Sequence, residues 1–135
     1  MSYRYRDHSG GITVRSTKRM KRNIAKVGTP VKIRGYRFTS TRTYKHDDGS
    51  TYDVTTNHEA VMVYGTKGTA RLEGYCWSYL GCGPRGLYDM LVRLKVDRVL
   101  ANRIAYETPR LDKDGTDWEI ERVSCALGKY WRLND

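Results

Sequence analysis

The sequence predicts an α+β fold. We expect an antiparallel β-meander of about four strands with one main amphipathic helix packed on it, a basic N-terminal arm and helix, and a C-terminal β-hairpin. Three observations predict it: a strand-like composition with turn signals over residues 31–79, apolar side chains at helical spacing over residues 87–94, and a strongly basic N-terminal third. With 135 residues the chain is long enough for one hydrophobic core. We therefore expect an extension over residues 1–30 and a single α+β domain over residues 31–135.

The N-terminal residues predict a flexible arm followed by a basic helix. Residues 1–11 end in Ser-Gly-Gly and carry Arg4 and Arg6, so we expect this arm to become ordered only on binding. Ser16 is placed to cap a helix over residues 17–27, which a glycine and a proline then end. The apolar seam of that helix is Met20, Ile24 and Val27.

The next segment predicts the meander. Residues 31–44 and 51–56 are β-branched, aromatic and Thr-rich on either side of Asp-Asp-Gly-Ser, which is typical of a hairpin. Strands over residues 60–64 and 69–79 follow. Because side chains alternate across a strand, one face of the first and one of the fourth strand combine cations with aromatic rings. These residues are Lys32, Arg34, Tyr36, Phe38, Arg42 and Tyr44 in the first strand, and Arg71, Tyr75, Trp77 and Tyr79 in the fourth.

The C-terminal third predicts helices and then a hairpin. Leu87, Met90, Leu91 and Leu94 share one helix face, which we expect to cover the sheet, and a short helix follows over residues 97–104. Residues 106–111 and 116–123 resemble a second hairpin around Asp-Lys-Asp-Gly. A competing interpretation is a helix that begins at Thr116, since Thr116 and Glu119 form a capping box. Residues 86–108 also have the approximate length of a helix-turn-helix.

The charge distribution indicates a polyanion partner. Net charge is +10, and it divides into +12 over residues 1–45 and −2 over residues 46–135. Such asymmetry is typical of a nucleic-acid-binding segment attached to a near-neutral body, and the alternative is a solubilising tail. The chain holds 11 Tyr and 3 Trp but one Phe, which favours half-exposed rings that can stack on a ligand.

These patterns predict a non-enzymatic nucleic-acid-binding protein, for DNA or RNA, by itself or within a nucleoprotein complex. The basic N-terminal third contacts the phosphate backbone and aromatic rings of the sheet stack on bases. Arg85 belongs to a glycine-rich loop before a helix, which is either an anion site or a plain loop. The expected binding residues are Arg4, Arg6, Arg15, Lys18, Arg19, Lys21, Arg22, Lys26, Lys32, Arg34, Tyr36, Phe38, Arg42, Tyr75, Trp77 and Arg85.

Two other functions stay open. The first is an inhibitor or assembly factor of the size and composition that viruses and mobile elements encode, binding an acidic host protein or a nucleoprotein complex through a surface of Tyr, Trp and Arg. The second is a metal-dependent nuclease using Asp47, Asp48, His58 or Glu59. Adjacent strand residues point to opposite faces, which weakens the second, and we expect no catalytic residue, metal or cofactor.

The cysteines and the hydropathy pattern predict a cytoplasmic protein. Cys76, Cys82 and Cys125 form no CxxC pair and are odd in number, which fits a reducing compartment; zinc would need a histidine as a further ligand. The sequence has no apolar run of the length that crosses a bilayer and no signal-peptide pattern, so we expect no membrane association.

Overall fold

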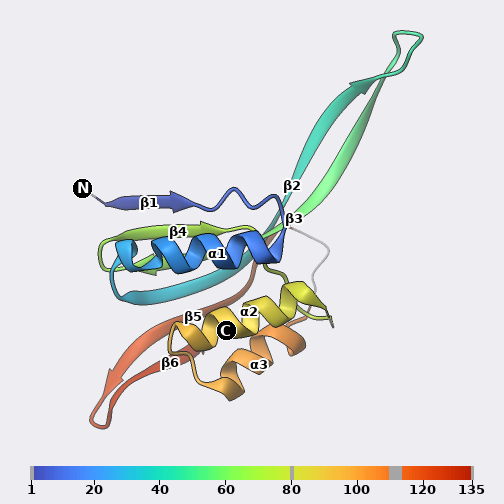
Figure 1. Ribbon diagram of the computed structural model, residues 1–135. Helices are drawn as coiled ribbons and strands as arrows, with labels where there is room; N and C mark the ends of the chain where they lie inside the picture. Colours follow the sequence, from blue (N-terminus) through green and yellow to red (C-terminus); the bar gives the residue numbers. More distant parts are fainter. Residues whose placement is uncertain (1, 80, 110–113, 135) are drawn as a thin grey trace.

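The computed structural model describes residues 2–79, 81–109 and 114–134, and within them the protein is a mixed α+β structure that consists mostly of sheet. In chain order its elements are β1 (Tyr3–Arg6), α1 (Thr13–Asn23), the 3₁₀ helix η1 (Ile24–Val27), β2 (Pro30–Lys45), β3 (Thr51–Gly65), β4 (Gly68–Leu72), α2 (Cys82–Arg93), α3 (Arg98–Glu107), β5 (Gly115–Cys125) and β6 (Gly128–Asn134). Figure 1 shows their arrangement. None of the helices in the described ranges is long and apolar enough to cross a membrane.

The sheet differs from the predicted four-stranded antiparallel meander. Six strands of the described chain form one sheet in the order β1-β4-β3-β2-β5-β6, and β1 runs parallel to β4. The N-terminal residues are therefore an edge strand and not a flexible arm. The amide of Tyr3 donates to the carbonyl of Lys67 at 2.9 Å, and the amide of Asp7 donates to the carbonyl of Arg71 at 3.0 Å. These bonds satisfy backbone groups that the edge of β4 would otherwise leave unpaired.

The predicted fourth strand is too long. β4 ends at Leu72, and the chain then leaves the sheet towards α2. At the exit the amide of Glu73 donates to the carboxylate of Asp7 at 3.0 Å instead of to a neighbouring strand, and Gly74 lies so close to Ser16 that a Cβ at this position would collide with it. The residues that follow belong to a loop and not to a strand, so their side chains do not alternate between sheet faces.

The first helix begins earlier than predicted. α1 starts at Thr13, so Ser16 lies inside the helix and does not cap it. The Ser16 hydroxyl is buried and donates to the carboxylate of Asp7. The predicted apolar seam does face the core, because Met20 and Val27 are buried.

The C-terminal region is a hairpin with different boundaries from those predicted. α3 continues to Glu107, where a strand was expected, and Asp97 caps its first turn by accepting from the amide of Leu100 at 2.9 Å. Residues 110–113, which comprise the end of the strand expected over 106–111 and the start of the expected turn, lie outside the described residues. Thr116 lies in β5, so the helix alternative is wrong, and the last residues form β6.

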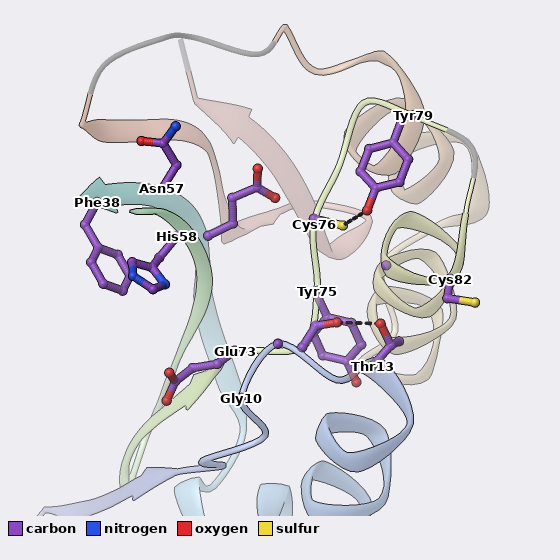
Figure 2. A pocket seen from close by; sticks show the side chains of 14 residues that line it. Gly10, Thr13, Phe38, Asn57, His58, Glu73, Tyr75, Cys76, Tyr79 and Cys82 are labelled. Carbon is purple, nitrogen blue, oxygen red and sulfur yellow. Dashed lines mark hydrogen bonds between the residues drawn. The ribbon is translucent and has the colours of Figure 1, made fainter. Parts of the chain in front are cut away.

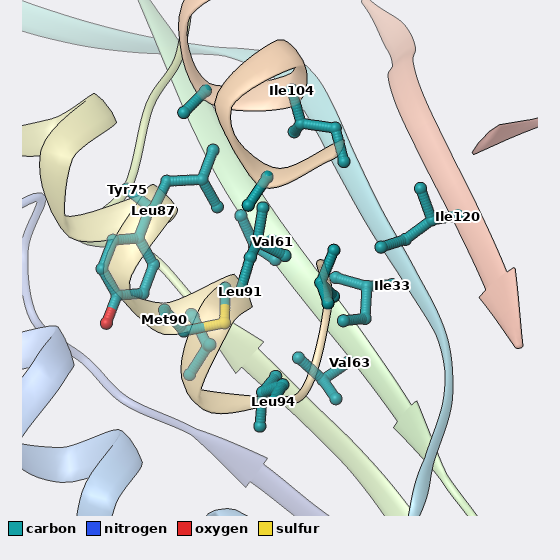
Figure 3. Packing of buried hydrophobic residues seen from close by; sticks show 14 of the residues in the cluster. Ile33, Val61, Val63, Tyr75, Leu87, Met90, Leu91, Leu94, Ile104 and Ile120 are labelled. Carbon is teal, nitrogen blue, oxygen red and sulfur yellow. The ribbon is translucent and has the colours of Figure 1, made fainter. Parts of the chain in front are cut away.

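The helices pack on one face of the sheet. Buried residues of α1, α2 and α3 join those of the inner strands in one cluster (Figure 3). Its members include Met20, Ile33, Val61, Val63, Leu72, Leu87, Met90, Leu91, Ile104 and Ile120. The opposite face has no helix from the described chain over it, and we call it the helix-free face.

The β2–β3 hairpin extends far beyond the sheet. These strands have 16 and 15 residues, against 5 in β4, so within the described chain their outer halves pair only with each other (Figure 1). We call residues 39–57 the arm, which is a different segment from the N-terminal arm expected over residues 1–11. Every residue of the arm is exposed.

Candidate nucleic-acid interface

The helix-free face carries two continuous rows of side chains across the sheet. Residues paired directly in neighbouring strands point to the same face. One row runs Arg6, Arg71, Met62, Arg34, Glu119 and Asn134, and the other runs Arg4, Thr69, Tyr64, Lys32, Glu121 and Arg132. Five cations from β1, β4 and β2 therefore share one part of this face.

A cluster of rings and guanidinium groups lies beside these rows. The guanidinium carbon of Arg34 lies 4.9 Å from the centroid of the Tyr36 ring, and that of Arg71 lies 4.9 Å from the centroid of Phe38. His58 stacks on Phe38 with ring centroids 4.9 Å apart. We call these five residues the cation–aromatic cluster. All five are half-buried, so each keeps part of its surface accessible to a ligand.

Lysine and tyrosine repeat this arrangement in the neighbouring row. The ammonium nitrogen of Lys32 lies 4.9 Å from the centroid of the Tyr64 ring. An ammonium or guanidinium group above an aromatic ring is attracted by the ring quadrupole, which holds both groups in place. The helix-free face therefore presents ordered cations together with rings.

The edge of this face contains an ion pair between β1 and the end of β4. The guanidinium of Arg6 donates to the carboxylate of Glu73, and Arg71 lies 4.0 Å from the same carboxylate. The hydrogen bond from Arg6 and the attraction of both arginines hold the pKa of Glu73 below its ordinary value. Since Arg4 and Arg6 are exposed, the β1 edge stays cationic.

Two carboxylates lie on the part of the helix-free face that β5 forms. Glu119 lies 3.6 Å from the ammonium of Lys32, and Glu121 accepts from Arg132. A hydrogen bond from Asn134 and the charge of Lys32 hold the pKa of Glu119 below its ordinary value. The part of the face that favours an anion is thus bounded by β1 and β2.

A pocket adjoins the cluster where the arm leaves the body (Figure 2). It has a volume of about 570 Å³, and Phe38 and His58 form part of its lining. Across from them lie Thr13, whose hydroxyl donates to the carbonyl of Gly74 at 2.7 Å, and Tyr79. A ligand on the helix-free face therefore has a polar recess next to the stacked rings.

The cations of α1 lie in the helix layer, on the other side of the sheet. Arg15, Lys18, Lys21 and Arg22 are exposed. Arg19 is structural, because its guanidinium donates to the carbonyls of Asp7 and, at 2.7 Å, His8. The basic N-terminal third was expected to act as one surface, but the fold divides it between two. Lys26 belongs to the helix side and lies 5.8 Å from the Tyr3 ring centroid.

Two residues that were expected to stack on bases are buried. Tyr75 and Trp77 are 2% and 0% exposed, because they belong to the loop that packs into the core. The hydroxyl of Tyr75 lies 2.9 Å from that of Thr17, and burial raises its pKa. The indole of Trp77 donates to Asp117 at 2.7 Å. Neither ring can stack on a ligand in this conformation.

The remaining predicted residues lie away from the cluster. Arg42 is on the exposed arm, whose two Lys/Arg and three Asp give it a net charge of −1. Arg85 is exposed in the first turn of α2, 3.9 Å from the carboxylate of Asp89. An anion at Arg85 would therefore meet a neighbouring carboxylate.

The carboxylates and histidines considered for a nuclease are not brought together. Asp47 and Asp48 lie in the turn at the tip of the arm, whereas His58 and Glu59 lie at its base. Over ten residues of extended strand this is a separation of about 30 Å. Among the described residues no group of three or more His, Cys, Asp or Glu side chains could hold a metal ion.

Sequence reasoning left Arg71, Tyr64 and His58 out of the expected binding set. These three residues reach the cation–aromatic cluster or the row beside it through the pairing of β2, β3 and β4. The sequence indicates which face of its own strand Arg71 occupies, but not which residues of the other strands lie beside it. A scan against protein-family models, a search of curated proteins and a search of solved structures found no match to this chain.

Proposed function

We propose that the protein is a non-enzymatic nucleic-acid-binding protein that holds a single strand of DNA or RNA on its helix-free face. The observation that carries the proposal is the cation–aromatic cluster, in which Arg34 and Arg71 lie over Tyr36 and Phe38. Unpaired bases stack on aromatic rings and on guanidinium planes, whereas paired bases within a duplex do not offer their faces.

The cations around the cluster supply the contact to phosphate. Arg4 and Arg6 on β1 and Lys32 on β2 flank the rings, and phosphates attract such groups whatever the base sequence. Stacking is also tolerant of sequence, because every base has a π-face. The proposal therefore entails binding with steep salt dependence and weak sequence preference.

The experiment is fluorescence anisotropy with labelled 20-nucleotide oligo-dT and oligo-rU over a salt series, for the wild type, R34Q/R71Q and K18Q/R22Q. Both double variants remove two charges, but from opposite sides of the sheet. We expect R34Q/R71Q to weaken binding by about tenfold or more, because two guanidinium planes that stack on bases are lost, and to lower the salt slope by no more than about 1.4, the value for two phosphate contacts. A larger loss in K18Q/R22Q, or no binding by the wild type at low salt, would overturn the proposal.

We place this activity in the cytoplasm. The support is the state of the cysteines: Cys76, Cys82 and Cys125 form no disulfide. Thiols persist in reducing compartments. Cysteine alkylation of protein in intact cells, followed by mass spectrometry, tests the location: oxidised cysteines in freshly lysed cells would contradict it.

A protein-binding role is the second candidate, and the arm is the observation that favours it. Tyr44 and Tyr52 stack 5.6 Å apart and are each 43% exposed, next to the exposed Val54. Exposed tyrosines of this kind are enriched at protein interfaces, and the arm has no positive net charge for a phosphate backbone. A nuclease-resistant 1:1 complex that Y44S/Y52S abolishes is the expected result for this role; unchanged capture of the partner by that variant would contradict it.

A further inference from the structure

The outer face of α1 is a row of exposed cations without acidic neighbours in the helix. Arg15, Lys18, Lys21 and Arg22 are all exposed, and α1 contains no Asp or Glu. Within the described ranges, none of these four side chains takes part in an ion pair. On the helix-free face, by contrast, Arg6, Lys32 and Arg71 each have a carboxylate within 4.0 Å.

The cationic surface continues from α1 onto the end of α2. A groove of about 600 Å³ lies between the two helices, and Lys21, Arg93 and Lys95 contribute to its lining. Asp89 is the one acidic residue among those that line it. With Lys21, Arg93 and Lys95 against Asp89, the groove keeps a positive net charge, and it adds two cations to the four of α1.

This surface and the cation–aromatic cluster lie on opposite sides of the sheet. Met20 of α1 and Met90 of α2 are both buried in the core cluster that the helices share with the strands, and Figure 3 shows Met90 there. The outer face of α1 thus points away from the helix-free face. The part of a ligand that stacks on Phe38 is therefore on the opposite side of the sheet from Lys18 and cannot contact it.

The chemistry of the two surfaces also differs. Residues 13–27 contain no aromatic side chain, so α1 can neutralise phosphates but has no ring on which bases can stack. Cations alone suit a duplex, whose bases are covered and whose backbone carries about one negative charge per 1.7 Å of axis. We infer that the α1 face binds the phosphate backbone of a second, double-stranded segment, so that one molecule bridges a single strand and a duplex. This inference rests on the proposed function of the helix-free face.

A capture assay tests the inference. Biotinylated 20-nucleotide oligo-dT is held on beads, the protein is added, and a fluorescent duplex of about 15 base pairs is applied. We expect the wild type to retain the duplex and K18E/R22E to lose about tenfold or more of it, while K18E/R22E still binds oligo-dT as the wild type does. In solution, the duplex should not displace oligo-dT, because the two probes occupy separate surfaces.

The outcomes separate the two proposals. If the duplex displaces oligo-dT, or if K18E/R22E retains the duplex as well as the wild type does, the α1 inference is wrong and the helix-free face still binds its strand. If oligo-dT does not bind the wild type at all, the proposed function fails, and the bridging role fails with it. Circular dichroism and thermal unfolding of K18E/R22E confirm that the exposed substitutions leave the fold intact.

Discussion

The guanidinium carbon of Arg71 lies 4.9 Å from the centroid of the Phe38 ring, although the two residues belong to β4 and β2, which β3 separates. Between them, β3 contributes Ala60, which is fully buried even though it lies on the helix-free face. A small side chain at this position leaves room for the long arginine to reach across. The cation–aromatic cluster is therefore a product of three strands and their register.

Removing the rings of Tyr36 and Phe38 separates the contribution of stacking to the binding free energy from the contribution of charge. We expect Y36A/F38A to weaken oligo-dT binding by about 1–3 kcal/mol for each base that loses its platform, with little change in salt slope because no cation is lost. Anisotropy titrations over a salt series measure both quantities. Y52A, which removes an exposed ring from the arm, is the control and should bind as the wild type does. Equal losses in Y36A/F38A and Y52A would contradict this assignment.

The Asp7 carboxylate joins the N-terminal segment to α1 and to the exit from β4. It is 1% exposed and accepts from the amides of Ser9 at 3.1 Å and Glu73 at 3.0 Å, as well as from the Ser16 hydroxyl. We expect D7A to lower the free energy of unfolding by about 2–4 kcal/mol, because buried donors lose their acceptor. Urea denaturation measures it, with exposed D89A as the control. A change below about 1 kcal/mol would show that these bonds are not needed.

We expect the free energy of unfolding to fall at low pH, in part because the carboxylate of Glu73 becomes protonated. Its pKa lies below the ordinary value of 4.5 because Arg6 donates a hydrogen bond to it and both Arg6 and Arg71 attract it. A carboxylate whose pKa is lowered in the folded state stabilises the fold above its unfolded-state pKa, and this contribution is lost as pH falls through the folded-state pKa. Below about pH 4.5, E73Q should therefore lose less unfolding free energy than the wild type, by on the order of 1 kcal/mol. Parallel pH profiles from urea unfolding would contradict it.

The arm should be dispensable for folding and for strand binding. Thr39 and Asn57 are paired directly, so an Asn-Gly turn can replace the residues between them. Because the arm is exposed and has a net charge of −1, we expect unfolding free energy to change by less than about 1 kcal/mol and oligo-dT affinity by less than about threefold. Chemical denaturation and anisotropy measure the two. A tenfold loss of affinity would place Arg42 or the arm tyrosines in the nucleic-acid interface.

Local patterns predicted the elements whose cause is local. The Asp-Asp-Gly-Ser turn with its flanking β-branched residues predicted the β2–β3 hairpin, although β3 joins the two strands expected over residues 51–56 and 60–64 into one. The spacing of Leu87, Met90 and Leu91 predicted the helix that packs on the sheet. Each signal depends on residues close together in the chain. The alternation that places Arg34, Tyr36 and Phe38 on one face of β2 was available for the same reason.

Contacts between distant segments caused the errors. Residues 3–6 have no pattern that shows their parallel pairing with β4, some 65 residues away. The sequence from 69 to 79 has a strand-like composition, yet the contacts of Asp7 and Ser16 turn the chain out of the sheet after Leu72, which carries Tyr75 and Trp77 into the core. The basic residues were expected to form one surface because the sequence does not show on which side of the sheet α1 packs. In the structure, the cations of β1 and those that β2 contributes to the helix-free face lie on one side of the sheet, and those of α1 lie on the other.

Photo-crosslinking tests the central proposal most directly. The protein is irradiated in complex with an oligonucleotide in which iodouracil replaces single thymines, and mass spectrometry identifies the linked residues. We predict links to Tyr36, Phe38 and Tyr64 on the helix-free face, lost when excess unlabelled oligo-dT competes. Links confined to the tyrosines of the arm or to Tyr88 of α2, with none on the helix-free face, would contradict the proposed interface.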